Sequence, residues 1–175
     1  MKIDIIPIIK DHIETLRDDR SGRYSFNDFA LFYGAPLVGG ASIAYSSIKF
    51  DSNFYNVSIT FFGIFIALLL NVQVAVFGIF QRKWEKPEDE NLAEIQKSKL
   101  EQRRSLLGEL NSNLSYLILI SCFSLVTFLV FFVFPFRGSF SSVISCVLYG
   151  HFVLTLMMSV KRAHTLFQME YEGHC

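Results

Sequence analysis

The feature that most constrains this chain is the placement of its charged residues. Four stretches contain no Asp, Glu, Lys or Arg: residues 29–48, 55–80, 115–134 and 139–160. All 16 Lys and Arg and all 16 Asp and Glu therefore lie in the rest of the chain. A core helix of a soluble protein does not need so long an uncharged run, whereas a helix that crosses a bilayer does. The pattern excludes an ordinary soluble domain, a disordered chain and a secreted disulfide scaffold, and predicts an all-α membrane protein with four transmembrane helices.

The basic residues predict how these four helices are oriented. Five Lys or Arg lie in residues 1–28, seven in 81–114 and two in 161–175, whereas the connections 49–54 and 135–138 carry one each. Because cytoplasmic loops are enriched in Lys and Arg, we expect the three basic segments, and so both termini, to be cytoplasmic. The mixed charges of the N-terminal segment predict no signal peptide. These features together predict a multi-pass membrane protein.

The N-terminal segment is predicted to form a short amphipathic helix. Pro7 suits a first helical position, and Ile9, Ile13 and Leu16 recur with helical spacing. Such a helix either lies on the bilayer beside the first span or provides a docking surface for another chain.

Residues 81–114 form the largest predicted cytosolic segment. The leucines Leu100, Leu107, Leu110 and Leu114 give a partial apolar stripe along a predicted helix. Because both ends of the segment join spans at the same membrane surface, we expect the helix to lie flat, to bend near Ser98 or Gly108, or to bundle with other copies.

The charged residues of this segment have two predicted roles. Neighbouring charges of opposite sign suit an oriented contact with a soluble partner, and we expect them to form its interface: Glu90, Glu94, Lys97 and Lys99. The residues expected to contact lipid headgroups are Trp84, Arg103 and Arg104. The alternative is a solvated helix that only spaces the spans.

Small residues recur at four-residue steps in three of the four spans. Such residues let helix backbones approach closely. The predicted packing positions are Gly39, Gly40, Ala44, Gly63, Ala67, Ala75, Ser142, Cys146 and Gly150. They exceed what packing four helices within one chain requires, so we expect the protein to form a homo-oligomer.

A few polar residues are predicted to form a layer inside the membrane. Asn71 lies 11 residues before Arg82, and His151 lies 10 before Lys161, so both are expected at a similar depth. Ser121 or Ser124 falls at a comparable level. Such a layer suits hydrogen bonds between helices, a proton-sensitive switch, or a ring that lines a pore.

Catalytic and cofactor motifs are missing from the sequence. It contains no HExxH, GxSxG or Walker loop, and no carboxylate within the four spans. The four histidines and three cysteines are too scattered to predict a metal site or a disulfide framework. We expect no enzyme and no cofactor, and the zero net charge gives no reason to expect direct binding to nucleic acid.

The layout resembles the KwaA-like membrane subunits of Kiwa, a bacterial anti-phage defence system. The local resemblance lies in residues 19–29, which run into Leu31–Pro36, and in the charged exit Val160–His164. It implies a homo-oligomeric membrane sensor that works with a cytosolic DNA-binding effector. No binding residue carries over from it.

Three function classes are consistent with these observations. A sensor or scaffold that docks a cytosolic effector is favoured, because a sizeable cytosolic segment contrasts with very short outer connections. A pore-forming effector requires a polar stripe along a span, of which only fragments are present. A small transporter commonly shows an internal repeat, and spans 1–2 and 3–4 share no such pattern.

Overall fold

The computed structural model describes residues 4–16, 29–81, 90–134 and 139–172, with the side chains of 90–96, 170 and 172 left out. These residues are almost entirely helical, and none of them forms a strand. The elements, in chain order, are α1 (Ile6–Glu14), the π-helix η1 (Ala30–Gly34), α3 (Ala35–Tyr45), α4 (Ser52–Phe80), α5 (Glu90–Val133) and α6 (Phe140–Glu172). The all-helical prediction is confirmed.

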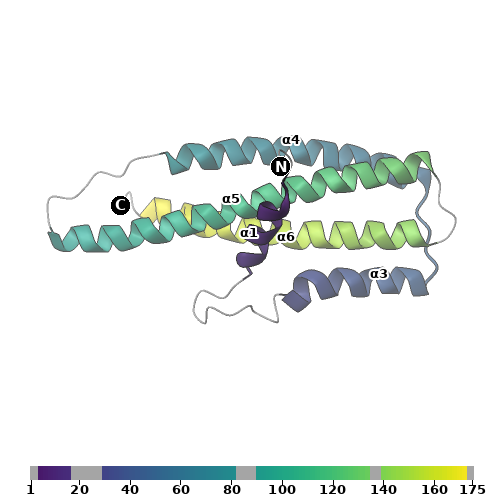
Figure 1. The fold of residues 1–175 in the computed structure, drawn as a ribbon, viewed down its shortest axis with the longest axis horizontal. Helices are drawn as coiled ribbons and strands as arrows, with labels where there is room; N and C mark the ends of the chain where they lie inside the picture. The colour runs from purple at the N-terminus through teal and green to yellow at the C-terminus, as the bar shows by residue number, and fades with distance from the viewer. Residues whose placement is uncertain (1–3, 17–28, 82–89, 135–138, 173–175) are drawn as a thin grey trace.

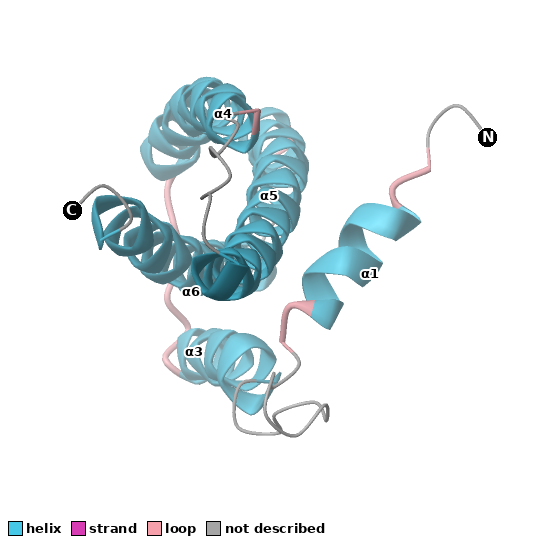
Figure 2. Cartoon of the chain, turned by 90° about the vertical axis from the view of Figure 1, so that its left-hand side faces the viewer, coloured by secondary structure: helices cyan, strands magenta, loops and turns pink. Residues whose placement is uncertain are grey.

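Helices α3, α4, α5 and α6 lie along the long axis of the molecule (Figure 1). The end view shows α4, α5 and α6 grouped together, with α3 beside α6 (Figure 2). The short helix α1 lies across α5. Three segments are long and apolar enough to cross a membrane, namely Ser52–Phe80, Lys97–Val133 and Phe140–Met169. The apolar helix over Ala30–Tyr45 is shorter.

A seven-residue repeat explains how α4, α5 and α6 pack. On α4 the buried residues Tyr55, Phe62, Leu69 and Val76 follow one another at intervals of seven. On α5 one series of buried positions, apart from Asn113 and Tyr116, alternates in steps of four and three: Arg103, Leu107, Leu110, Leu114, Leu117, Ser121, Ser124, Phe128 and Phe131. This spacing keeps one seam of a helix facing its neighbours over many turns, as in a coiled coil. The core is therefore one continuous seam.

Helix α5 corrects the prediction for residues 81–114. The structure shows one helix of 44 residues over Glu90–Val133, about 66 Å long at 1.5 Å per residue, which continues through Ser98 and Gly108 into the predicted span without a break (Figure 1). The seam crosses the predicted boundary at Leu114 without interruption, so the apolar span and the charged segment are one rod. Helix α6 likewise continues to Glu172, into the predicted tail.

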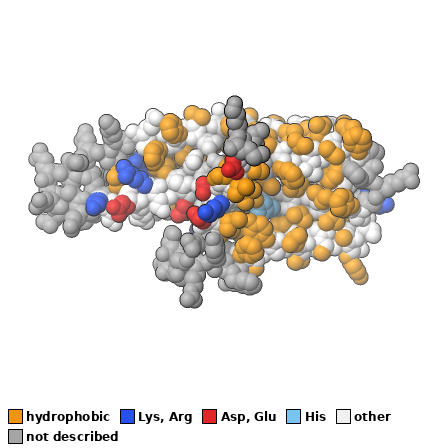
Figure 3. All heavy atoms as spheres, in the orientation of Figure 1, with side chains coloured by type: hydrophobic (Ala, Val, Ile, Leu, Met, Phe, Trp, Pro, Cys, Tyr) orange, Lys and Arg blue, Asp and Glu red, His pale blue; other side chains and the backbone are white. Residues whose placement is uncertain are grey.

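Side chains of different type occupy different parts of the molecule (Figure 3). Hydrophobic side chains spread over the part of the visible face to the right of α1, whereas most of its acidic and basic side chains lie around α1 and to its left. We call the charged parts of α5 and α6, residues 97–112 and 161–171, the stalk. Helix α1 thus lies where the apolar part meets the stalk.

Both ends of α4 are satisfied by side chains. At the start, the Asp51 carboxylate accepts a hydrogen bond from the Phe54 N–H at 2.9 Å. At the end, the Arg103 guanidinium of α5 donates to the Ile79 carbonyl at 2.7 Å. Arg103 is buried, so its predicted contact with lipid headgroups is wrong. The physical reason is its place in the α5 seam, which turns it toward the last carbonyls of α4.

Candidate functional site

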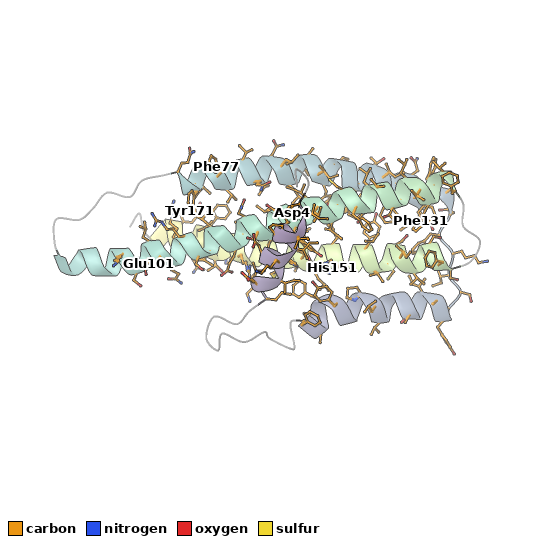
Figure 4. All side chains as sticks on the ribbon, in the orientation of Figure 1. Asp4, Phe77, Glu101, Phe131, His151 and Tyr171 are labelled. Atoms are coloured by element: carbon orange, nitrogen blue, oxygen red, sulfur yellow. The ribbon has the colours of Figure 1, made fainter. Side chains whose placement is uncertain are left out.

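The most distinctive polar arrangement lies where α1 crosses the bundle. We call it the junction cluster and define it by the side chains of His12, Asn113, Tyr116 and His151 and the carbonyl of Phe32. Its members come from α1, α5, α6 and η1, so one small cluster connects four elements. Figure 4 shows His151 beside α1 at this crossing.

Helix α1 places an imidazole where its apolar face meets the bundle. Pro7 is in the first turn of α1, where a missing N–H removes no helical hydrogen bond. Ile8, His12 and Leu16 follow at four-residue steps, and His12 and Leu16 are buried. The His12 ring is fully buried and stacks on Tyr116, with ring centroids 3.8 Å apart and planes 3° from parallel. His12 is therefore the residue by which α1 is inserted into the bundle.

The polar atoms of His12 are only partly satisfied. Its Nδ1 lies 2.9 Å from the Asn113 Oδ1, and the Thr15 hydroxyl lies 3.0 Å from the same oxygen. The His12 Nε2 and the Asn113 Nδ2 are buried and have no hydrogen-bond partner among the described residues. Buried polar groups usually have partners, so these two atoms mark an uncommon site.

A proline in the first turn of α3 frees a carbonyl that contacts the second histidine of the cluster. Pro36 has no N–H, so the Phe32 carbonyl, four residues earlier, lacks its usual α-helical donor. The His151 Nδ1 lies 3.2 Å from this carbonyl oxygen. The His151 Nε2 lies 2.7 Å from the Tyr116 hydroxyl. With Nδ1–H donating to Phe32, Nε2 accepts from Tyr116, which fixes a neutral tautomer of His151.

An arginine holds the end of α1. The Arg162 guanidinium of α6 donates to the Thr15 carbonyl at 2.5 Å, just past the last residue of α1. The same guanidinium forms an ion pair with Glu109 of α5 at 3.1 Å. A cation at a helix C-terminus interacts favourably with the carbonyls there. Thus α1 is anchored twice, by His12 inside the bundle and by Arg162 at its end.

The surroundings of His12 keep its ring neutral. Burial lowers the pKa of His12 from 6.5 to about 4, and the electrostatic interactions with His151 and with the Arg162 guanidinium act in the same direction. The hydrogen bond to Asn113 opposes this shift. At pH 7 the docked ring is therefore uncharged, which suits its stacking on Tyr116.

The residues predicted to form an intramembrane layer differ in their burial. His151, Ser121 and Ser124 are buried. The Ser121 hydroxyl donates to the Leu117 carbonyl at 2.6 Å, and the Ser124 hydroxyl has no partner among the described residues. Asn71 is exposed, so the expectation that it points inward beside His151 is wrong. The reason is its angular position, because the α4 face toward the bundle is the one through Leu69 and Val76.

The predicted packing residues of α3 and α6 meet one another. A Cβ added at Gly39 would lie 3.2 Å from the Cys146 sulfur, and one at Gly150 would lie 3.2 Å from the Pro36 Cβ. Gly40 faces Val147 and Val143 of α6 in the same way. Ser142 accepts a hydrogen bond from the Phe50 N–H at 2.8 Å. Small residues thus bring η1 and α3 close enough for the Phe32 carbonyl to reach His151.

The remaining small residues do not pack within the chain. Ala44, Ala67 and Ala75 are exposed, and a Cβ at Gly63 would meet only Leu125, at 3.9 Å. They bring no two helices of the chain into close contact, and their predicted role in packing between copies of the chain stays a prediction. On α4 the larger residues at seven-residue intervals occupy the inner face, so the small residues and Asn71 lie on the outer face.

The predicted partner interface falls partly outside the described residues. Lys97, Lys99 and Arg104 are exposed on the stalk. The side chains of Glu90 and Glu94, and the whole of Trp84, lie outside the described part of the chain.

Sequence reasoning missed most of the junction cluster. The signal for His12 was its place in the stripe Ile8, His12, Leu16 on the apolar face of α1. Asn113, Tyr116 and Arg162 carried no comparable signal, because only the crossing of α1 over α5 and α6 brings them together.

The cluster offers hydrogen bonding and proton binding. No group of three or more His, Cys, Asp or Glu side chains in the described ranges is placed to hold a metal ion. Comparisons with protein-family models, with curated proteins and with solved structures found no match to this chain.

Proposed function

We propose that the chain is a homo-oligomeric membrane sensor or scaffold that docks a cytosolic effector protein, as in a bacterial anti-phage defence complex of the Kiwa type. In this proposal residues 29–48, 55–80, 115–134 and 139–160 span the bacterial inner membrane. Both termini and the stalk are then cytoplasmic. The three long apolar helices support membrane insertion.

The observation that carries this proposal is the continuity of α5. A single helix joins the apolar half of the bundle to the exposed residues of the stalk, including Lys97 and Lys99. A packed helix moves as a unit, so a change among the spans reaches the stalk without an intervening hinge. That is the property a sensor with a cytosolic output requires.

The outer face of α4 supports self-association. Ala67, Asn71 and Ala75 are exposed on a helix that is apolar enough to cross a membrane. An amide carries both donors and acceptors, so an Asn71 in a second copy can satisfy the first. The surrounding small residues let two such helices approach closely.

A pore is the second candidate, and one observation favours it. Hydroxyl side chains are buried along α5 and α6: Ser121, Ser124, Ser141, Ser145, Thr155 and Ser159. Several of them donate to carbonyls of their own helix, for example Ser145 to Ser141 at 2.7 Å and Thr155 to His151 at 2.9 Å. If α5 and α6 separated, these hydroxyls would line the opening. Ion flux through liposomes that contain the purified protein tests this candidate.

Cross-linking in cells tests the docking proposal. A lysine-reactive cross-linker should join the stalk lysines Lys97 and Lys99 to one soluble protein, which should co-purify at fixed stoichiometry. The double variant Lys97→Glu with Lys99→Glu should lose this protein while still inserting into the membrane. Lys49→Glu is the matched control, because Lys49 is exposed at the opposite end of the bundle. If the soluble protein co-purifies equally with the wild type, the double variant and Lys49→Glu, docking at the stalk is contradicted.

A further inference from the structure

We propose that α1 is a clasp that a proton releases: it stays docked while His12 is neutral and leaves the bundle when His12 becomes charged. This inference concerns the chain alone and does not depend on a docked effector.

The first argument is the geometry of the docked ring. A neutral His12 donates from Nδ1 to the Asn113 Oδ1, and its Nε2 then carries a lone pair. A proton turns Nε2 into a second donor, and no acceptor among the described residues lies within reach of this buried atom. A buried charged donor without a partner is strongly unfavourable. The docked position therefore stabilises the neutral ring and is unfavourable for the charged one.

The second argument is the set of titratable and charged groups that face His12. From α6 come the imidazole of His151, with ring centroids 6.4 Å apart, and the guanidinium of Arg162. From α5 come the Tyr116 ring and, further off, the Glu109 carboxylate, which is paired with Arg162. From η1 comes Tyr33, whose ring centroid lies 5.3 Å from that of His151. On α1 itself, Asp11 and Glu14 are exposed. None of these elements supplies a free anion that would stabilise a charged His12.

The third argument is that α1 is attached by few contacts other than those of His12 and the hydrogen bond from Arg162 to the Thr15 carbonyl. Beyond His12 and Leu16, its residues are exposed or only half-buried, and Ile5, Ile6 and Ile9 are exposed. These exposed isoleucines give the released helix an apolar surface suited to a bilayer. Release therefore exchanges one apolar contact for another, and the state of His12 decides between them.

The sign of the pH effect follows from linkage. The docked ring has a pKa of about 4, and a free histidine titrates near 6.5. Docking is therefore fully favoured above pH 6.5 and weakens as the pH falls toward 4. Between pH 7.5 and pH 5 the equilibrium constant for docking should fall about 30-fold.

Hydrogen exchange measured by mass spectrometry on the full chain in lipid nanodiscs tests the clasp. Protection of the peptide that covers residues 4–16, corrected for intrinsic exchange, should fall about 30-fold from pH 7.5 to pH 5. Protection of residues 107–117 in α5 should not change. His12→Phe preserves the ring stacked on Tyr116 and cannot bind a proton, so its α1 should be equally protected at both pH values. His164→Gln removes an exposed histidine of α6 and should leave the response intact.

Three outcomes overturn the proposal: wild-type protection of α1 that does not change with pH, a response that persists in His12→Phe, or a response that disappears in His164→Gln. If α1 of His12→Phe does not dock at either pH, a measurement on the wild-type protein still tests the proposal. Its His12 ring, followed by NMR, should titrate well below pH 6.5, and titration at or above 6.5 refutes the clasp.

Discussion

The close approach of α3 and α6 makes a quantitative prediction at Gly150. A Cβ at this position would lie 3.2 Å from the Pro36 Cβ and 3.4 Å from the Pro36 Cα and Cγ. A proline ring has no other rotamer by which to move aside, so the two helices must separate. Overpacking of this kind destabilises by about 1–3 kcal/mol. The same substitution also improves helix propensity, by about 1 kcal/mol.

Comparison with a second helical glycine removes the contribution of helix propensity. Gly108 is also helical, and a Cβ there would meet nothing within 4 Å. Gly108→Ala should therefore stabilise the protein slightly, and Gly150→Ala should be less stable than Gly108→Ala by about 1–3 kcal/mol. Unfolding in mixed micelles of dodecyl maltoside and SDS, followed by circular dichroism, measures both free energies. Equal free energies of unfolding for the two variants would refute the close packing of α3 on α6.

Three further predictions concern other parts of the molecule. Arg103→Met keeps an unbranched side chain but removes the donor to the Ile79 carbonyl, so it should lower the free energy of unfolding by about 1–3 kcal/mol. Arg104→Met, at an exposed position, is its control and should change this free energy by less than about 0.5 kcal/mol. Asn71→Leu should leave the free energy of unfolding of the single chain unchanged but raise the dissociation constant of the oligomer about 3-fold to 20-fold. Native mass spectrometry measures this constant, and a monomeric wild-type protein would contradict the prediction. Alkaline phosphatase should be inactive when fused after Glu172 and active when inserted at residues 135–138, because the distribution of basic residues predicts a cytoplasmic first site and an external second site. The reverse pattern would exclude this orientation.

Helix α5 shows what the sequence could predict and what it obscured. The absence of charged residues identified 115–134 as an apolar helix. The spacing of the leucines from Leu100 to Leu114 separately identified an apolar stripe in the segment before it. The alternation of four and three residues continues from Leu114 through Ser121 to Phe131. Counting this repeat across the charge boundary would have predicted one rod and a buried Arg103. A boundary of charge marks where solvent changes, and a helix need not end there.

The junction cluster could not be predicted in the same way. His12 and His151 are separated by most of the chain, and their proximity depends on the path of α1 over the bundle. Asn71 and His151 were expected at a similar depth, and this step relied only on helical rise. To predict which way the Asn71 side chain points, the angular position of the α4 inner face is also needed. The bulky residues at seven-residue intervals determine that position.

A continuous α5 also transmits rotation. Because no hinge interrupts the helix from Val133 to the stalk, a turn of its apolar half about the helix axis is delivered undiminished to the other end. A turn of about 20°, the drift between a straight helix and a strict heptad repeat, carries a side chain on the rim of a helix of about 5 Å radius through about 2 Å. Lys97 and Lys99 would then shift sideways by more than half the length of a hydrogen bond. A rotation too small to alter the shape of the bundle is thus large enough to make or break polar contacts at its tip.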